Sequence, residues 1–286
     1  MKLPKLPADL PQCELTVLNA GHYYASLHLM KKGNEKQKIW GPALFYLIKH
    51  PKHGYILFDT GYSTRFFDAA RSFPYSLMRL TLPVRISEEE NAVNQLQAMG
   101  IAPDDVTVIL SHMHVDHVGG IHDFPNSRII VSKVEWAFTR HSAFKLLRNS
   151  YLKSLFDKIN PNLVQLVDFD RAERYGPFAK AFDLFQDGTM ILVPLPGHAI
   201  GQMGLILNCS AAERYFLIAD AVYVQGNYRE NKCGAWLSKI AHYDSKQYES
   251  HFPFLRALEQ ANSELLLLPS HDPDVYAKYV NREAYV

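Results

Sequence analysis

The chain has 286 residues, of which 48% are hydrophobic and 21% are charged, a composition typical of a soluble globular protein. Its 30 Lys and Arg nearly balance its 29 Asp and Glu, so it lacks the basic excess with which nucleic-acid-binding proteins hold phosphates. The composition therefore argues against a nucleic-acid partner.

The cysteines and the N-terminus bear on the cellular compartment. Cys13, Cys209 and Cys233 are widely spaced and form no C-x-x-C pair, which argues against both a disulfide framework and a thiolate zinc site. The first residues, MKLPKLPADLPQCEL, are interrupted by prolines where a signal peptide is apolar, and no apolar run approaches a membrane span in length. We predict a cytoplasmic protein without a membrane partner, and the sequence leaves its oligomeric state open.

Apolar runs with the character of β-strands recur along the chain, with helical patterns between them. The predicted strands are Ala43 to His50, Tyr55 to Gly61, Val106 to His112, Arg128 to Ser132, Thr189 to His198, Met203 to Asn208, Arg214 to Asp220 and Glu264 to His271. The clearest helical pattern runs from Ser87 to Gly100, where Ser87 and Glu90 match a capping box and Gly100 suits the C-terminal end. We predict an α/β fold and, because no repeat or linker interrupts the chain, a single domain over residues 1–286.

Several predicted strands deliver an ionisable residue at or near their ends. These residues are Asp59, His112, His198, Asp220 and His271. Sites in open α/β folds gather at the carboxyl ends of strands. We therefore predict that one edge of the sheets carries a functional site.

The segment LSHMHVDHVGG, Leu110 to Gly120, is dense in metal-binding side chains: His112, His114, Asp116 and His117. Imidazole nitrogen and carboxylate oxygen are the ligands that zinc and similar ions prefer, and the cluster follows directly after an apolar strand. We interpret it as a metal-binding loop rather than as solvated or core histidines. The remaining histidines are predicted not to be ligands: His22, His28, His50, His53, His122, His141, His242 and His251.

The motif H-x-H-x-D-H resembles that of the metallo-β-lactamase-fold hydrolases, and PLPGH, LIADA and LPSHD follow in the order of that family's later motifs. The resemblance covers most of the chain. It implies a four-layer αβ/βα sandwich with the metal site at the edge of two β-sheets. The metal ligands that it implies are His112, His114 and His198 for one ion, Asp116, His117 and His271 for a second, and Asp220 as the bridge between both.

Asp59, in LFDTG, resembles the aspartate that in this family lies behind the ligands and orients them. The alternative role of Asp59 is to cap the turn that follows it.

Two ions would lower the pKa of a shared water to give hydroxide near neutral pH and would polarise the substrate oxygen. Asp116 and Asp220 are thus the predicted catalytic carboxylates. No G-x-S-x-G motif offers a serine nucleophile. We expect two zinc ions, with iron, manganese or cobalt as alternatives.

Tyr223 stands three residues after Asp220, and this D-x-x-Y spacing resembles the N-acyl homoserine lactonases, in which the tyrosine contacts the lactone. The resemblance implies a hydrolase that opens a lactone or cleaves a related carboxylic ester, with Tyr223 as a catalytic hydrogen-bond donor. The alternative for Tyr223 is a packing role. Residues 62–86 and 136–159 could form the pocket for an acyl chain or could only pack on the fold as amphipathic helices.

Other functions of the same fold remain as alternatives. A thioesterase or another hydrolase of this fold is the first of them. A glyoxalase-type thioesterase needs a C-terminal region for which few residues follow His271, and a diiron oxidoreductase has a carboxylate where His114 stands. RNA-processing members need a basic surface that binds phosphate groups, and the balanced charge of this chain does not indicate one. A metal-stabilised binding protein is the non-enzymatic alternative.

Overall fold

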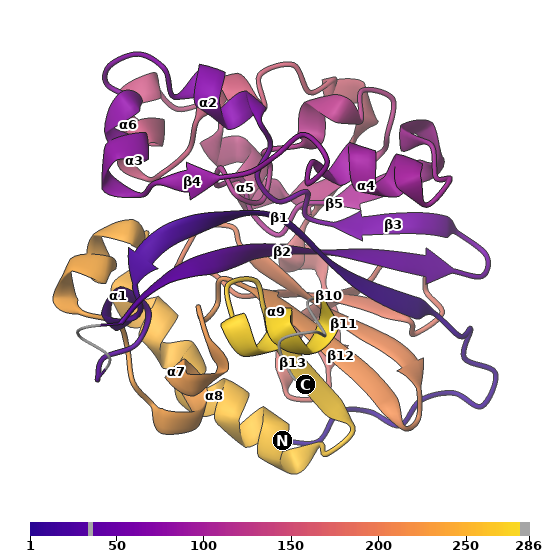
Figure 1. Ribbon diagram of the computed structural model, residues 1–286. Helices are drawn as coiled ribbons and strands as arrows, with labels where there is room; N and C mark the ends of the chain where they lie inside the picture. The colour runs from indigo at the N-terminus through magenta and orange to yellow at the C-terminus, as the bar shows by residue number, and fades with distance from the viewer. Residues whose placement is uncertain (34–36, 281–286) are drawn as a thin grey trace.

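The computed structural model describes residues 1–33 and 37–280. Two β-sheets lie face to face, with helices on their outer sides (Figure 1). The first sheet has the order β4-β1-β2-β3-β5-β6-β7 and contains β1 (Glu14–Ser26), β2 (Lys38–His50), β3 (Gly54–Phe58), β4 (Val84–Arg85), β5 (Val106–Ile109), β6 (Ile129–Ser132) and β7 (Val164–Val167). The second has the order β13-β12-β11-β10-β9-β8 and contains β8 (Glu173–Tyr175), β9 (Phe178–Asp183), β10 (Met190–Pro194), β11 (Met203–Ser210), β12 (Glu213–Ala219) and β13 (Leu265–Pro269).

Helices cover the outer face of each sheet. Those over the first sheet are α2 (Arg65–Ala69), α3 (Ser76–Thr81), α4 (Ala92–Ala98), α5 (Lys133–Phe138) and α6 (Ala143–Arg148). Those over the second are α7 (Gln225–Glu230) and α8 (Ser245–Ala261), while α1 (Leu27–Met30) follows β1 and α9 (Pro273–Tyr279) packs against β1 and β2. This arrangement of helices, sheet, sheet and helices confirms the predicted four-layer α/β sandwich.

The layering follows from strands that are apolar on both faces. In β2, Leu44, Tyr46 and Ile48 belong to the core between the two sheets, whereas Phe45 and Leu47 alternate with them and pack in the core beneath the helices. A strand covered on both sides has no solvent face, so its sequence is a continuous apolar run instead of an alternating one. This is why the run ALFYLI could be recognised as a buried strand.

All eight predicted strands are present, but β4, β7, β8, β9 and the much longer β1 were missed. Its sequence, ELTVLNAGHYYAS, contains Asn-Ala-Gly, which resembles a turn signal. The strand instead continues through an irregularity: its register against β2 shifts between Asn19 and His22, and Gly21 has a φ of 81°. The turn-like residues thus mark a bulge inside a long strand.

The predicted helix start at Ser87 is wrong. α4 begins at Ala92, and residues before it form turns in which the Ser87 N–H donates to the Glu90 carboxylate at 2.8 Å. The Asn91 side chain accepts a hydrogen bond from the Thr64 N–H at 3.0 Å and donates one to Glu88 at 2.8 Å. These contacts hold residues 87–91 against the loop that contains Thr64. Of the expected capping box, only the hydrogen bond from the Ser87 N–H to Glu90 forms, and it closes a turn instead of starting a helix.

The strand directions bring several strand ends to one edge. β3 runs parallel to β5, β12 runs parallel to β13, and β10 and β12 both run antiparallel to β11. The residues that follow β3, β5, β10, β12 and β13 therefore emerge on the same side of the sandwich, as predicted. Among the described residues, no helix is both long enough and apolar enough to cross a bilayer.

Candidate metal centre

Four of the predicted ligands lie in the tight loop after β5: His112, His114, Asp116 and His117. The N–H groups of His117 and Val118 donate to the carbonyl of His114 and close the turn. The Gly119 N–H donates to the Gly61 carbonyl at 3.0 Å, and a Cβ atom on Gly119 would lie 2.7 Å from that oxygen. The loops after β3 and β5 thus meet backbone to backbone, which requires glycine at position 119.

Glu135, a buried residue of α5, ties this loop to the one that carries His198. Its carboxylate accepts hydrogen bonds from the N–H groups of Met113 and Gly201, both at 2.9 Å, and from the Tyr151 hydroxyl at 2.5 Å. Burial raises the pKa of Glu135, and these donors act against the rise by stabilising the charged form. No pattern in the sequence indicates this role for Glu135.

The first group of donors consists of His112, His114 and His198, whose ligand atoms lie within 4.8 Å of one another. Within this group, His114 Nδ1 lies 2.8 Å from His198 Nε2. All three side chains are buried. Three neutral imidazoles around one point form a donor set that suits zinc.

The second group consists of Asp116, His117 and His271, also within 4.8 Å of one another. His271 Nε2 lies 3.2 Å from Asp116 Oδ2. Asp220 lies between the two groups, because its Oδ1 is 3.3 Å from His117 Nε2 and its Oδ2 is 3.2 Å from His198 Nε2. The structure therefore brings all seven predicted ligands together and places Asp220 where it can reach both groups.

Partners on the outer side of the cluster orient two imidazoles. His117 Nδ1 lies 2.8 Å from the Asp59 carboxylate, and His271 Nδ1 lies 2.7 Å from the Pro42 carbonyl, so each Nδ1 donates outward. When the imidazole is neutral, each Nε2 then presents its lone pair to the centre. His117 Nε2 is buried without a hydrogen-bond partner, as are His112 Nε2 and Asp220 Oδ1. Buried orphan acceptors are costly, and cations at this point would satisfy them, so the donor set fits two metal ions.

Asp59 is held in a backbone conformation uncommon for aspartate, with a φ of 65°. Its two carboxylate oxygens accept hydrogen bonds from the Ser111 N–H and hydroxyl, both at 2.7 Å, as well as from His117. These contacts favour an orienting role over a turn cap. The side chain lies behind the predicted ligand His117 rather than within the donor groups.

In the metal-free chain, electrostatics divide the histidines into two classes. Burial lowers the pKa of His114 to about 4 and puts the pKa values of His112 and His198 well below the usual range. Burial acts in the same direction on His117 and His271, but neighbouring carboxylates, Asp220 foremost, outweigh it and raise the pKa of His117 to about 10 and that of His271 well above its usual range.

A sequence profile described as the metallo-beta-lactamase superfamily matches residues 39–276. The chain belongs to the metallo-beta-lactamase superfamily.

Relatives within this superfamily include the N-acyl homoserine lactonase AttM of Azorhizobium caulinodans, which is 28% identical over 95% of this chain and 97% of its own length. A solved N-acyl homoserine lactone hydrolase, with the product N-hexanoyl-L-homoserine at its catalytic metal center, superposes with a TM-score of 0.72 at 21% identity, over 100% of this chain and 97% of that one. AidC, a dizinc quorum-quenching lactonase, superposes with a TM-score of 0.61 at 20% identity, over 95% and 90% of the two chains. The two structural likenesses show the shared metallo-beta-lactamase fold.

A cavity of about 480 Å³ opens over the donor groups of this metallo-beta-lactamase domain. Its wall is mostly apolar, and both segments singled out from the sequence contribute: Tyr62, Met78, Thr81 and Leu82 from residues 62–86, and Arg148 and Ser150 from residues 136–159. Two further stretches were missed, and they supply Tyr23, Ala25, Leu29 and Met30 near β1, and Leu237, Ser238, Ile240 and Ala241 in the 3-10 helix η6 (Trp236–Ala241). Tyr23 and Ala25 lie in the strand that was missed, and the others lie in the short elements α1 and η6, which have no periodicity that would indicate a pocket wall.

Tyr223 lines this cavity, and its hydroxyl lies 3.3 Å from His198 Nδ1. His242, predicted to be an uninvolved histidine, also approaches that nitrogen, with its Nδ1 3.2 Å away. The His242 ring stacks on Tyr248 with centroids 3.9 Å apart. Tyr223 and His242 thus both contact Nδ1 of His198, on the edge of the imidazole opposite Nε2.

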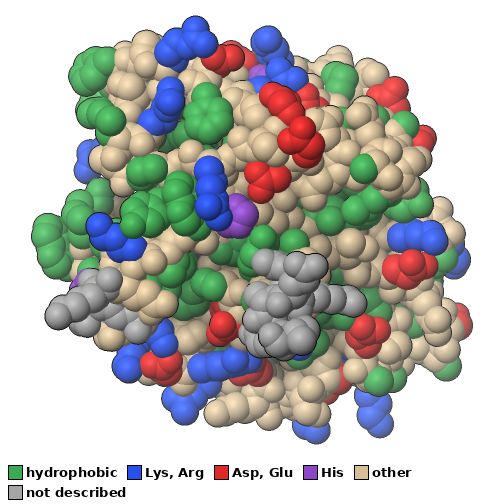
Figure 2. Space-filling model, in the orientation of Figure 1, with side chains coloured by type: hydrophobic (Ala, Val, Ile, Leu, Met, Phe, Trp, Pro, Cys, Tyr) green, Lys and Arg blue, Asp and Glu red, His purple; other side chains and the backbone are tan. Residues whose placement is uncertain are grey.

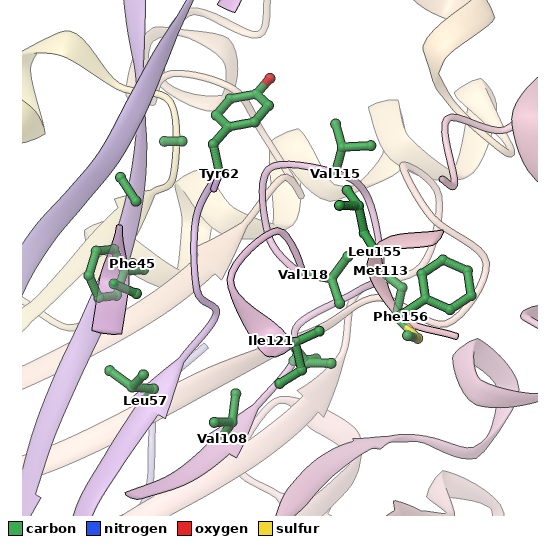
Figure 3. Packing of buried hydrophobic residues seen from close by; sticks show 14 of the residues in the cluster. Phe45, Leu57, Tyr62, Val108, Met113, Val115, Val118, Ile121, Leu155 and Phe156 are labelled. Carbon is green, nitrogen blue, oxygen red and sulfur yellow. The ribbon is translucent and has the colours of Figure 1, made fainter. Parts of the chain in front are cut away.

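Tyr62 also lines this cavity and has an unpaired hydroxyl. The side chain is buried and its hydroxyl has no hydrogen-bond partner. In Figure 3 the Tyr62 oxygen is directed away from Val118 and Ile121. The hydroxyl is therefore a buried group that no described residue satisfies.

A third set of neighbouring donors, His50, His53 and Asp187, does not suit a metal ion. His50 Nδ1 accepts hydrogen bonds from the N–H groups of Lys52 and His53 at 3.1 and 3.2 Å. A neutral imidazole that accepts at Nδ1 carries its proton on Nε2, which donates to Asp187 at 3.1 Å. These hydrogen bonds favour the sequence prediction that His50 and His53 are not ligands.

Proposed function

We propose that this protein is a dimetal hydrolase that opens the ring of N-acyl homoserine lactones or closely related acyl lactones. The observation that carries the proposal is the convergence of seven His and Asp side chains, six of them buried and Asp116 partly buried, beside an apolar cavity. The similarity to AttM, an N-acyl homoserine lactonase, over nearly the whole of both chains supports the substrate class.

The proposal assigns His112, His114 and His198 to one ion, Asp116, His117 and His271 to the other, and Asp220 to both. Zinc is the proposed metal because imidazole and carboxylate donors in sites of this kind suit it, and the similar lactonase AidC is described as dizinc. When bound, the ions supply a Lewis acid for the carbonyl oxygen and lower the pKa of water.

The residues of the chain position the substrate and handle its oxygen atoms. Apolar side chains such as Met78 and Leu82 line the cavity and would take the acyl chain. We assign the Tyr223 hydroxyl to the lactone oxygen, to which it would donate a hydrogen bond as the ring opens. We assign the unpaired Tyr62 hydroxyl to a polar group of the acyl amide.

The same proposal includes a reducing, cytoplasmic location, which the free thiols of Cys13, Cys209 and Cys233 support. It includes no nucleic-acid partner, in keeping with the balanced charge of the chain.

The test is a substrate panel with zinc-loaded protein: N-acyl homoserine lactones of several chain lengths, a simple aliphatic lactone, a thioester, a phosphodiester and a β-lactam. We expect kcat/KM to be highest for an N-acyl homoserine lactone and to depend on acyl length. A higher kcat/KM for the thioester or the phosphodiester would contradict the proposed substrate class. It would not contradict the proposed metal site.

A further inference from the structure

Three segments surround the mouth of the cavity, and we call residues 71–82, 136–156 and 231–243 together the pocket rim. Each contributes to the cavity wall, through Leu82, Arg148 and Ile240 among others. The second and third segments also touch each other, since the rings of Phe138 and Tyr243 lie 5.8 Å apart in an edge-on contact. All three segments of the pocket rim therefore border the same cavity, and two of them are in direct contact.

Large hydrophobic side chains are concentrated and exposed on this rim. Three of them, Leu80, Phe144 and Trp236, are 76%, 79% and 74% exposed. The complete set on the rim is Phe73, Leu77, Leu80, Phe144, Trp236, Leu237, Ile240 and Tyr243, more than half of the exposed large hydrophobic residues in the described chain. Scattered apolar residues on a surface need no explanation, whereas a gathered set of this kind marks an interaction surface.

The three segments of the pocket rim also have an excess of basic residues, although Glu135, Asp157, Glu230 and Asp244 directly flank two of them. They contain eight of the 30 Lys and Arg residues and none of the 29 Asp and Glu. The basic residues are Arg71, Arg79, Arg140, Lys145, Arg148, Lys153, Lys232 and Lys239. Five of them, Arg79, Arg140, Lys145, Arg148 and Lys153, form no ion pair with any described carboxylate, while the other three pair with residues outside the rim. In Figure 2, hydrophobic and basic side chains share the left edge, where α3 and α6 lie in Figure 1.

The combination of exposed hydrophobic and basic side chains distinguishes between three kinds of partner: a second copy of the chain, a nucleic acid and a lipid surface. A second copy docked about a two-fold axis would place this cationic rim against itself, and like charges would repel. A nucleic acid would use the cations, but it would gain little from exposed aliphatic residues such as Leu80 and Ile240. An anionic lipid surface uses both features, because apolar side chains enter the boundary of the acyl chains while Lys and Arg contact the headgroups.

We propose that the pocket rim docks on the surface of an anionic phospholipid bilayer, with the cavity mouth facing the lipid. This replaces the sequence expectation that the protein has no membrane partner. It goes beyond the proposed hydrolase activity and does not require it. If the activity is also as proposed, an acyl lactone dissolved in the bilayer enters the cavity without crossing bulk water.

The test is co-sedimentation of the full chain with vesicles of phosphatidylcholine alone or with added phosphatidylglycerol. We expect at least tenfold more protein bound to the anionic vesicles, and weaker binding at high salt because screening reduces the attraction of the cations. The triple variant Leu80→Ser, Phe144→Ser and Trp236→Ser, which changes no cavity-lining residue, should lose most of the binding. The double variant Arg140→Glu and Lys145→Glu should lose it as well.

A matched control replaces exposed hydrophobic residues outside the rim, Met99→Ser with Leu166→Ser, and should bind vesicles like the unchanged chain. Thermal unfolding of each variant checks that it is folded. Equal binding to both vesicle types, no binding, or the same loss in the control would overturn the proposal. Light scattering without lipid provides a second check: a dimer that the triple variant converts to monomer would show that the rim serves self-association instead. The substrate panel is read independently, so failure of one proposal does not decide the other.

Discussion

At the scale of single residues, the predicted ligands depend on partners that fix their outer nitrogen atoms. Asp59 accepts from His117 Nδ1, the Pro42 carbonyl accepts from His271 Nδ1, and Tyr223 and His242 both approach His198 Nδ1. These contacts set the tautomers that leave Nε2 free. The ligand motif could be read from the sequence, but the partner carbonyl could not, since Pro42 lies far from His271 along the chain.

Replacing Tyr223 by Phe tests the proposed hydrogen bond to the lactone oxygen. We expect metal content to persist and kcat/KM for an aliphatic lactone to fall on the order of tenfold to a thousandfold, as when one oxyanion donor is lost. An activated aryl ester, whose phenolate leaves readily, should lose less. If kcat/KM falls by the same small factor for both substrates, Tyr223 has only a packing role.

The orphan hydroxyl of Tyr62 allows a separate prediction. Because this hydroxyl has no partner in the protein, Tyr62→Phe should leave the unfolding temperature unchanged or slightly raised while KM for an N-acyl lactone rises by up to about tenfold. The matched change Tyr228→Phe removes a hydroxyl that donates to Glu259 at 2.7 Å, so it should lower stability and leave KM unchanged. An unaltered KM in Tyr62→Phe would remove Tyr62 from the substrate site.

At the scale of elements, the site depends on loops that the strands deliver to one edge and on α5, which joins two of these loops through Glu135. The strand runs could be predicted because both faces of β2 and its neighbours are buried. β1 was hidden by a bulge that imitates a turn, and the start of α4 was displaced by contacts of Asn91 with another loop. Tertiary contacts of this kind leave no periodic signal in the sequence.

Glu135→Gln tests the role of α5. The substituted amide would turn an N–H group toward one of the two backbone donors, Met113 or Gly201, and leave that donor buried without an acceptor. We expect a loss of about 2–4 kcal/mol in the free energy of unfolding, together with reduced metal content. Glu173→Gln, at an exposed position, is the control and should change neither quantity. An unchanged Glu135→Gln protein would show that the link between the loops is dispensable.

At the scale of the whole molecule, we propose a single domain over residues 1–286 in which metal binding and stability are coupled. In the metal-free chain, carboxylates that outweigh burial raise the folded-state pKa of His117 to about 10, above the usual value of 6.5. A raised pKa stabilises the fold fully below the unfolded pKa, and this contribution is lost as pH rises toward the folded pKa.

The unfolding free energy of chelator-treated protein should therefore fall between pH 7 and 9, by at most about 1.4 kcal/mol per pH unit for each titrating histidine. His271, whose pKa is raised in the same way, adds to the slope. Zinc-loaded protein should show a smaller slope, because ions take the place of the protons on both residues. Urea unfolding at several pH values measures both slopes. A metal-free protein that gains stability over this range would contradict the assignment of protonated His117 and His271.

The account as a whole depends on two ions at the centre that His112, His114, Asp116, His117, His198, Asp220 and His271 form. Its most direct test is the metal content of protein purified without chelators, measured by inductively coupled plasma mass spectrometry. We predict about two transition-metal ions per chain, with zinc predominant, and about one or none in Asp220→Asn. A chain that holds no transition metal, takes up none when metal is added and is not activated by any would contradict the proposed function.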